Sequence, residues 1–169
     1  MVIRQASIEE FKELWEYSGS TTYKYFLDNL ESRNVEFWTI DNEGDLIGEL
    51  YIFWNSDDKD EANGYNRAYL CAFRVDKGYQ GKGYGSQLMK RVLKRVRNRG
   101  YTEVTIGIDN REYKKLKSMY NKFGFDKLLK STKVDNHYKN FQGKSTIYDE
   151  DYQIYINYLE DTQVNHKEV

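Results

Sequence analysis

The chain has 169 residues, 39% of them apolar and 16% aromatic, which suits one compact domain over residues 1–169. Its net charge of −1 hides an asymmetry, since residues 1–66 have a charge balance of −10, whereas residues 77–100 carry 8 basic residues and no acidic one. No apolar run approaches the roughly 18 residues of a membrane span, and eight positive charges do not make a broad nucleic-acid surface, so we expect neither a membrane nor a nucleic acid as partner.

The cysteine and histidine content excludes further classes. The single cysteine, Cys71, cannot form an internal disulfide, and the two histidines, His137 and His166, lie far apart without cysteine neighbours, so we predict no metal site. The start of the chain, MVIRQASIEEFKELW, turns polar too early for a signal peptide. We therefore expect a cytoplasmic protein.

The first half of the chain predicts strands and helices in an interleaved order. They are a strand at 2–6, a helix at 7–18, a second helix at 22–33, a hairpin at 35–55 that turns at 42–45, an acidic loop at 55–66 and a central strand at 68–75. The first helix opens with a capping box formed by Ser7 and Glu10. The last run, AYLCAFRV, is mostly apolar, as expected for a strand covered on both faces.

The second half continues the pattern of strands and helices. We predict an amphipathic helix that ends at Gly100, a strand at 103–108, a helix that ends at Gly124, and two final strands at 125–132 and 151–159. A polar connection that holds His137, Tyr138 and Phe141 separates the last two strands in this prediction. The tail after Leu159 is expected to fray.

The stretch YQGKGYGSQL, residues 79–88, places Gly81, Gly83 and Gly85 directly before the amphipathic helix. Such a loop lets backbone N–H groups approach a phosphate, and the helix dipole favours an anion. A plain flexible turn is the alternative. The dinucleotide pattern G-x-G-x-x-G and the P-loop pattern are both absent, which argues against the common nucleotide-binding motifs.

The same segment resembles the acetyl-CoA signature of the GNAT acyltransferases, Q/R-x-x-G-x-G/A, which Gln80, Gly83 and Gly85 match. The strand that ends at Val75 and the later MYNKFGF segment follow the family's order as well. The resemblance covers residues 67–126 and implies an α/β protein of the GNAT fold: a mixed central sheet of six or seven strands, flanked by helices and splayed at the two central strands.

The resemblance also implies how acetyl-CoA would bind. In the family, loop amides hold the pyrophosphate and the preceding strand bonds the pantetheine arm through its backbone. Carried over to this chain, the strand contacts fall on Phe73 and Val75. The loop contacts fall on Gln80, Gly81, Lys82, Gly83, Tyr84, Gly85 and Ser86. No metal takes part.

The family's chemistry points to two candidate catalytic residues. Tyr120 matches the family tyrosine that protonates the departing thiolate, although its place on an apolar helical stripe also suits a core side chain. In this mechanism the acceptor amine attacks the thioester directly, without an acyl-enzyme, because no nucleophile with a paired base is visible. Glu49 is our candidate for the base that deprotonates this amine, with a solvated or ion-paired glutamate as the alternative.

The resemblance predicts an N-acetyltransferase that uses acetyl-CoA, and the acidic first part favours a primary amine on a cationic small molecule as acceptor. Aromatic residues in that part are available to stack on an acceptor: Trp15, Tyr17, Tyr23 and Tyr25. Two alternatives stay open, a catalytically silent acyl-CoA-binding module and an acetyltransferase for protein N-terminal or lysine amines. A homodimer is a possible assembly.

Overall fold

The computed structural model describes residues 1–15 and 19–159, in which seven strands form one mixed sheet. In chain order the strands are β1 (Val2–Gln5), β2 (Val35–Asn42), β3 (Asp45–Phe53), β4 (Arg67–Val75), β5 (Glu103–Ile108), β6 (Lys127–Lys139) and β7 (Ser145–Tyr158). The helices are α1 (Ile8–Leu14), α2 (Thr21–Glu31), α3 (Tyr84–Asn98) and α4 (Tyr113–Lys122), with short 3₁₀ turns at Lys77–Tyr79 and Asn110–Glu112. The order of the strands across the sheet is β1-β2-β3-β4-β5-β7-β6.

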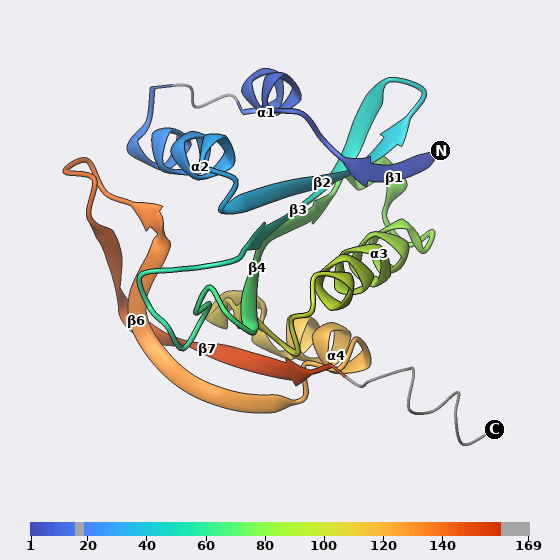
Figure 1. Cartoon of the computed structure of the whole chain (residues 1–169). Helices are drawn as coiled ribbons and strands as arrows, with labels where there is room; N and C mark the ends of the chain where they lie inside the picture. The colour runs from blue at the N-terminus through green and yellow to red at the C-terminus, as the bar shows by residue number, and fades with distance from the viewer. Residues whose placement is uncertain (16–18, 160–169) are drawn as a thin grey trace.

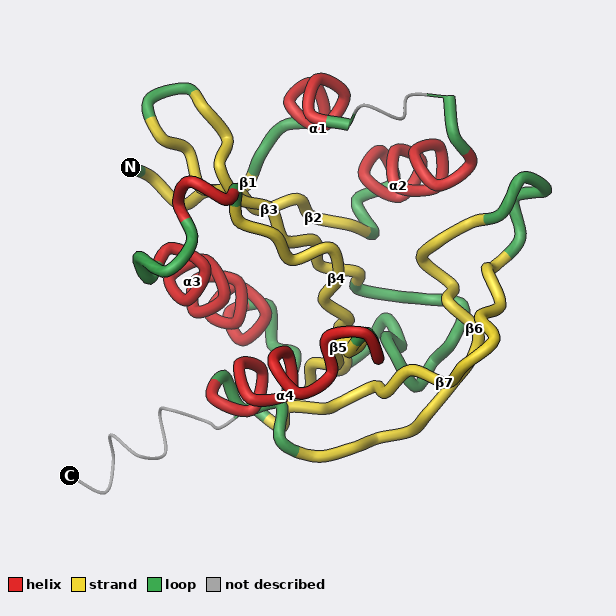
Figure 2. The backbone as a smooth tube through the Cα atoms, turned by 180° about the vertical axis from the view of Figure 1, so that it is seen from behind, coloured by secondary structure: helices red, strands yellow, loops and turns green. Residues whose placement is uncertain are grey.

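Helices cover both faces of this sheet (Figure 1). Helices α1 and α2 lie on one face, and α3 and α4 lie on the other, as the view from behind also shows (Figure 2). Each face has its own apolar cluster: Phe11 and Phe26 pack against Tyr51 and Phe53 under α1 and α2, whereas the buried side of α3 packs on the opposite face. This is the helix–sheet–helix arrangement expected from the sequence.

The two central strands separate halfway along their length. Strands β4 and β5 pair in parallel only between residues 67–70 and 103–106. Beyond Leu70, β4 pairs with β3 alone, and a register shift falls where Ala72 takes a left-handed backbone conformation at φ 54°. Strand β5 pairs with β7 along its whole length on its other edge, and beyond Ile106 β7 is its one partner strand in the described sheet. The predicted splay is therefore confirmed, and it leaves one edge of the last residues of β4 without a strand partner.

Most predicted elements in the first half are confirmed. The Ser7 hydroxyl accepts from the backbone N–H of Glu10 while the Glu10 carboxylate accepts from that of Ser7, so the capping box is present. The hairpin of β2 and β3 turns where predicted, with Asn42 paired to Asp45. Helix α1 is shorter than predicted and ends at Leu14, while residues 16–18 lie outside the described residues, as do His166 and the rest of the tail after Leu159.

The predicted polar connection between the last two strands is wrong. Strand β6 continues through His137 and Tyr138, and β7 begins at Ser145, so the two form one long curved hairpin (Figure 1). The tip is closed by Asn140, whose side-chain oxygen accepts from the backbone N–H groups of Gln142 and Lys144. Three register shifts bend the pair, which explains why no regular alternation marks these strands in the sequence.

Some basic side chains of α3, and Arg99 at its end, make contacts within the protein. The guanidinium of Arg95 makes a paired contact with the carboxylate of Glu36, at 2.6 Å for the shorter bond. Arg91 lies over the ring of Trp38 at 4.6 Å, and Arg99 lies over the ring of Trp54 at 4.2 Å. These arginines therefore anchor α3 on the sheet.

Candidate active site

The start of α3 presents a row of free backbone donors. Among the residues that the structure describes, the N–H groups of residues 81–86 have no hydrogen-bond acceptor, whereas the N–H of Gln87 already bonds the carbonyl of Gly83. Gly81 and Gly83 have positive φ values of 76° and 86°, and a Cβ at either would meet no atom within 4 Å. The loop therefore forms an open cradle of N–H groups at the positive end of a 15-residue helix.

Gly85, the third glycine of the loop, allows close packing of the helix on the sheet. A Cβ on Gly85 would lie 3.2 Å from Phe73 Cζ and 3.3 Å from Val75 Cγ2, so glycine lets the first turn of α3 lie close against β4. The side-chain amide of Gln80 donates to the carbonyl of Val75 at 2.8 Å, which ties the loop to the end of the same strand. The predicted residues Phe73, Val75, Gln80 and Gly85 are thus brought together with the cradle.

Gln80 and Lys82 differ from the other predicted loop residues in the groups that they present to a ligand. The backbone N–H of Gln80 donates to the carbonyl of Lys77 at 3.4 Å, so its place in the cradle is weaker than that of its neighbours. The ammonium of Lys82 lies 5.8 Å from the centre of the Tyr79 ring and is exposed beside the free N–H groups. Its charge adds to the attraction that this end of the helix has for an anion.

Tyr120 lies near the end of α4 on the same face as the cradle. Its ring is buried, with its centre 6.4 Å from that of Phe73 and 6.2 Å from that of Phe125. Burial raises the pKa of its phenol to about 12, and no hydrogen bond to its hydroxyl contributes to that pKa in the described part of the chain. The hydroxyl therefore stays protonated at neutral pH and is free to donate.

Glu49 lies on the opposite face of the sheet, in β3. It shares that face with Tyr51, whose ring packs under α1 and α2 and whose hydroxyl donates to Glu49 Oε2 at 3.1 Å. Trp15 Nε1 donates in turn to the Tyr51 hydroxyl at 2.8 Å. Arg74, the cross-strand partner of Glu49, donates from Nε to Glu49 Oε1 at 3.0 Å. Burial raises the pKa of the Glu49 carboxyl, although Arg74 opposes this shift.

The predicted acid and base thus lie on either side of the splay. Tyr120 and the cradle belong to the face of α3 and α4, and Glu49 belongs to the face of α1 and α2. Between β4 and β5 the backbone ladder stops at Leu70 and Ile106. A thioester held on one face would be approached by an acceptor from the other face through this break.

The aromatic residues predicted to stack on an acceptor are mostly used within the protein. Trp15 packs on Phe11 and Phe26, with ring centres 4.9 Å apart in both cases, and Tyr23 stacks on Phe11 at 5.4 Å. Tyr25 stacks on the ring of Phe53, and the ammonium of Lys139 lies over the ring of Tyr25 at 4.1 Å. Tyr17 lies outside the described residues.

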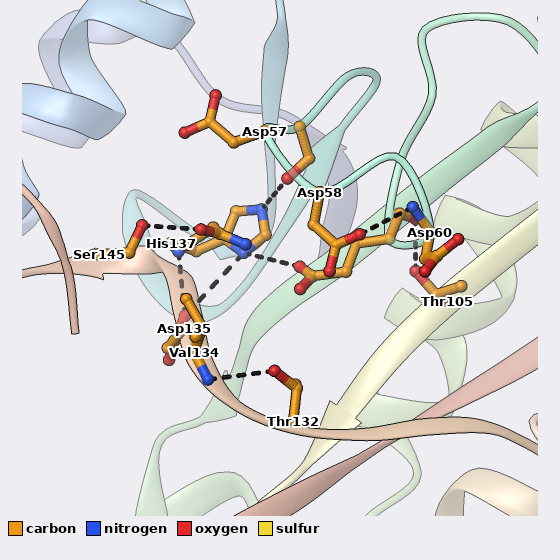
Figure 3. Close-up of polar contacts among 12 residues, drawn as sticks. Asp57, Asp58, Asp60, Thr105, Thr132, Val134, Asp135, His137 and Ser145 are labelled. Carbon is orange, nitrogen blue, oxygen red and sulfur yellow. Dashed lines mark hydrogen bonds and ion pairs between the residues drawn. The ribbon is translucent and has the colours of Figure 1, made fainter. Parts of the chain in front are cut away.

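A second polar cluster, which the sequence did not indicate, lies under the hairpin of β6 and β7 (Figure 3). His137 stacks on the ring of Tyr69 at 4.2 Å, its Nε2 lies 3.0 Å from the hydroxyl of Ser56, and its Nδ1 lies 3.2 Å from Glu61 Oε2. The Glu61 side chain has no exposed surface. Burial lowers the pKa of His137 to about 3 and raises that of Glu61 to about 8, so both groups favour their neutral forms.

This cluster joins the loop between β3 and β4 to the hairpin of β6 and β7. Ser56 and Glu61 belong to the loop between β3 and β4, and His137 belongs to β6, so the contacts join segments that lie far apart in the chain. The backbone of β6 is also tied to α2, because Thr22 Oγ1 accepts from the N–H of Lys139 at 3.0 Å. The histidine predicted to have no metal role therefore packs the hairpin against the sheet.

Two surface cavities lie away from the candidate residues. One, of about 440 Å³, is lined by residues that include Arg97, Lys122 and Lys127, and the other, of about 430 Å³, includes Glu36 and Arg95. Neither is lined by the cradle, Tyr120 or Glu49. The candidate site is thus defined by free backbone donors and by the break between β4 and β5.

Comparison with known proteins decides the family. A family model described as the acetyltransferase (GNAT) family matches residues 2–125, which include the cradle and Tyr120. The chain belongs to the GNAT acetyltransferase family. Among curated proteins, a probable spermine N(1)-acetyltransferase from Bacillus subtilis subsp. natto (strain BEST195) is 40% identical over 55 residues, which are 32% of this chain and 35% of that protein. The chain thus spans about a third of the length of the curated relatives it matches.

Solved structures show that this GNAT chain shares its fold with other acetyltransferases. The protein yncA, a putative acetyltransferase from Salmonella typhimurium solved with its cofactor acetyl-CoA, has a TM-score of 0.64 at 17% identity, with 95% of each chain covered. The ribosomal-protein-S18-alanine N-acetyltransferase from Escherichia coli has a TM-score of 0.67 at 14% identity, with 95% of this chain and 94% of that chain covered. In the described part of this chain, no helix has both the length and the apolar character to cross a membrane.

Proposed function

We propose that this GNAT chain transfers the acetyl group of acetyl-CoA directly to a primary amine of a cationic small molecule. The observation that carries the proposal is the open cradle, in which six consecutive N–H groups find no acceptor among residues 1–15 and 19–159, and the glycines of the loop leave the approach clear. Each N–H bond to a charged oxygen contributes about 1.5–3 kcal/mol. The donor set fits the pyrophosphate of acetyl-CoA.

Binding of acetyl-CoA and the chemical step would be divided among four groups of residues. The N–H groups of residues 81–86 would hold the pyrophosphate, and the unpaired edge of β4 near Phe73 and Val75 would bond the pantetheine arm. Glu49 would take a proton from the acceptor ammonium. Acetyl-CoA supplies an activated thioester, and when the amine forms its bond to the acetyl carbon and the carbon–sulfur bond breaks, Tyr120 would donate its proton to the leaving thiolate.

A base is needed because the acceptor arrives protonated. An aliphatic amine with a pKa near 10.4 is uncharged in only about one part in a thousand at pH 7.4, which costs on the order of 4 kcal/mol. The raised pKa of Glu49 brings this carboxyl closer to the working pH than an exposed glutamate would be. Its contact with Tyr51 keeps one carboxylate oxygen in place.

The choice of a small cationic amine rests on charge and on the relatives. The charge balance of −10 over residues 1–66 favours cations, and the curated relatives are named for spermine and spermidine. Spermidine is therefore the first acceptor to test. Protein N-terminal and lysine amines form the second candidate class. The structural neighbour from E. coli is named as an acetyltransferase for a ribosomal protein.

A panel of amines, read out by thiol release from acetyl-CoA, tests this proposal. We expect acetyl-CoA to raise the melting temperature and spermidine to release thiol, while the amine of glutamate releases far less. Tight binding of acetyl-CoA without thiol release for any amine, including peptide amines, would identify a silent acyl-CoA-binding module instead. No binding of acetyl-CoA at all would overturn the assignment of the cradle.

A further inference from the structure

The candidate base is already paired with a cation of the protein's own. Glu49 has only 12% of its side chain exposed, and Arg74 Nε lies 3.0 Å from its Oε1. A buried carboxylate that loses its partner is strongly destabilised, so the ionised form of Glu49 needs a positive charge beside it. An acceptor ammonium that binds Glu49 Oε1 competes with Arg74 for this oxygen.

Arg74 itself has a second carboxylate within reach. Its Nη1 lies 3.0 Å from Asp76 Oδ1, two residues along the chain. Half of its side chain is exposed, at 52%, and that of Asp76 is exposed at 41%, so water can follow a movement of either. The guanidinium can leave Glu49 and keep an ion pair.

The remaining groups around Glu49 do not offer another cation. Tyr51 on the same strand donates to Oε2, and Trp15, after α1, donates to that tyrosine. Cys71 on β4 is partly buried, and desolvation raises the pKa of its thiol, so it stays neutral. Asp76 adds a negative charge that raises the pKa of Glu49 further. In the described part of the chain, Arg74 is the cation that hydrogen-bonds to Glu49.

We propose that Arg74 holds the place of the acceptor's ammonium at Glu49 and moves to Asp76 when a cationic acceptor binds, which makes Arg74 the residue that selects cations. The inference rests on the proposed function, in which Glu49 receives the acceptor's proton. An ammonium replaces the guanidinium charge for charge. A neutral or anionic acceptor brings no positive charge to replace the guanidinium, so Arg74 stays on Glu49 and the acceptor is rejected.

The exchange predicts opposite effects for two substitutions that each remove one charge. Arg74→Gln removes the competitor, so spermidine should bind at least about tenfold more tightly at pH 9, the gain expected from freeing one charge-assisted hydrogen bond. Asp76→Asn removes the second site for Arg74, so spermidine should bind about threefold or more weakly. Arg74→Lys should stay close to the parent, and Lys94→Gln, on an exposed position of α3, is the matched control for lost charge.

Calorimetry of spermidine binding in the presence of CoA measures these constants without turnover, and melting curves verify that each variant folds. In Arg74→Gln the acid limb of kcat/KM should also move to higher pH, because Glu49 has lost a cation. Changes of the same sign in Arg74→Gln and Asp76→Asn, or none in either, would overturn the exchange. A Glu49→Gln protein with the parent single-turnover rate would instead overturn the proposed role of Glu49, so the two failures are distinguishable.

Discussion

Replacing Glu61 by Gln should make the stability of the protein less sensitive to rising pH. The Glu61 carboxyl has no exposed surface, and burial raises its pKa from 4.5 to about 8. The folded state therefore keeps a proton that the unfolded chain releases above pH 4.5. The stabilisation from this group is complete below pH 4.5 and is lost as the pH rises towards 8.

The size of the effect on the unfolding free energy follows from the shift in the pKa of Glu61. Each pKa unit corresponds to about 1.4 kcal/mol, so between pH 5 and pH 8 the parent protein should lose about 3 kcal/mol of unfolding free energy relative to Glu61→Gln. Glutamine copies the neutral carboxyl in shape and does not titrate. Urea unfolding of both proteins at several pH values measures the difference, and Glu9→Gln, at an exposed position of α1, is the control.

The competing arrangement is an ion pair between a charged Glu61 and a protonated His137, whose Nδ1 lies 3.2 Å away. That ion pair would raise the pKa of His137 above its ordinary value of 6.5, so the parent would lose stability relative to Glu61→Gln only above pH 6.5. Between pH 5 and pH 6.5 the two unfolding free energies would then run parallel, with glutamine less stable, and parallel curves in this range would refute the neutral pair. The test also reports on the hairpin of β6 and β7, because this cluster packs β6 on Tyr69.

Three further predictions concern the site. Tyr120→Phe should leave the melting temperature nearly unchanged and lower the single-turnover rate roughly 10²-fold, since it removes only the free hydroxyl; an unchanged rate would defeat its role as the acid. Gly85→Val should weaken acetyl-CoA binding in calorimetry about tenfold or more because its side chain meets Phe73 and Val75, whereas Gly78→Val, where a Cβ meets nothing within 4 Å, should bind normally; equal affinities would contradict this. Raising salt from low to physiological concentration should increase the KM for spermidine by screening the acidic charge of residues 1–66, and a constant KM would show that this charge is only solvated surface.

The glycine loop shows how a local signal can be interpreted from the sequence. Gly81 and Gly83 need positive φ values, and the helix start they precede has free N–H groups whatever the rest of the chain does. The amphipathic pattern of α3, the capping box of α1 and the turn of the first hairpin are equally local. Each depends on residues within a few positions of one another, so the sequence alone was sufficient to predict them.

The surroundings of the candidate catalytic groups depend on contacts between distant residues. The sequence singled out Glu49 but not its partner, because Arg74 lies beside it only through the register of β3 and β4, which the bulge at Ala72 shifts. In the same way, no pattern marks residues 133–139 as a strand. They pair with β7 across two of the three register shifts and are held by the burial of His137.

Fold class, glycine loop and the row of free N–H groups were thus determined by sequence, since hydrophobic period and backbone freedom act over short distances. The tertiary structure decided which charges meet. It placed Tyr120 and Glu49 on opposite faces of the sheet, and it placed Arg74 within hydrogen-bond distance of the carboxylates of Glu49 and Asp76. It also buried Glu61 beside His137. Such pairings follow from packing over tens of residues, where burial changes the energy of a charge far more than sequence neighbours do.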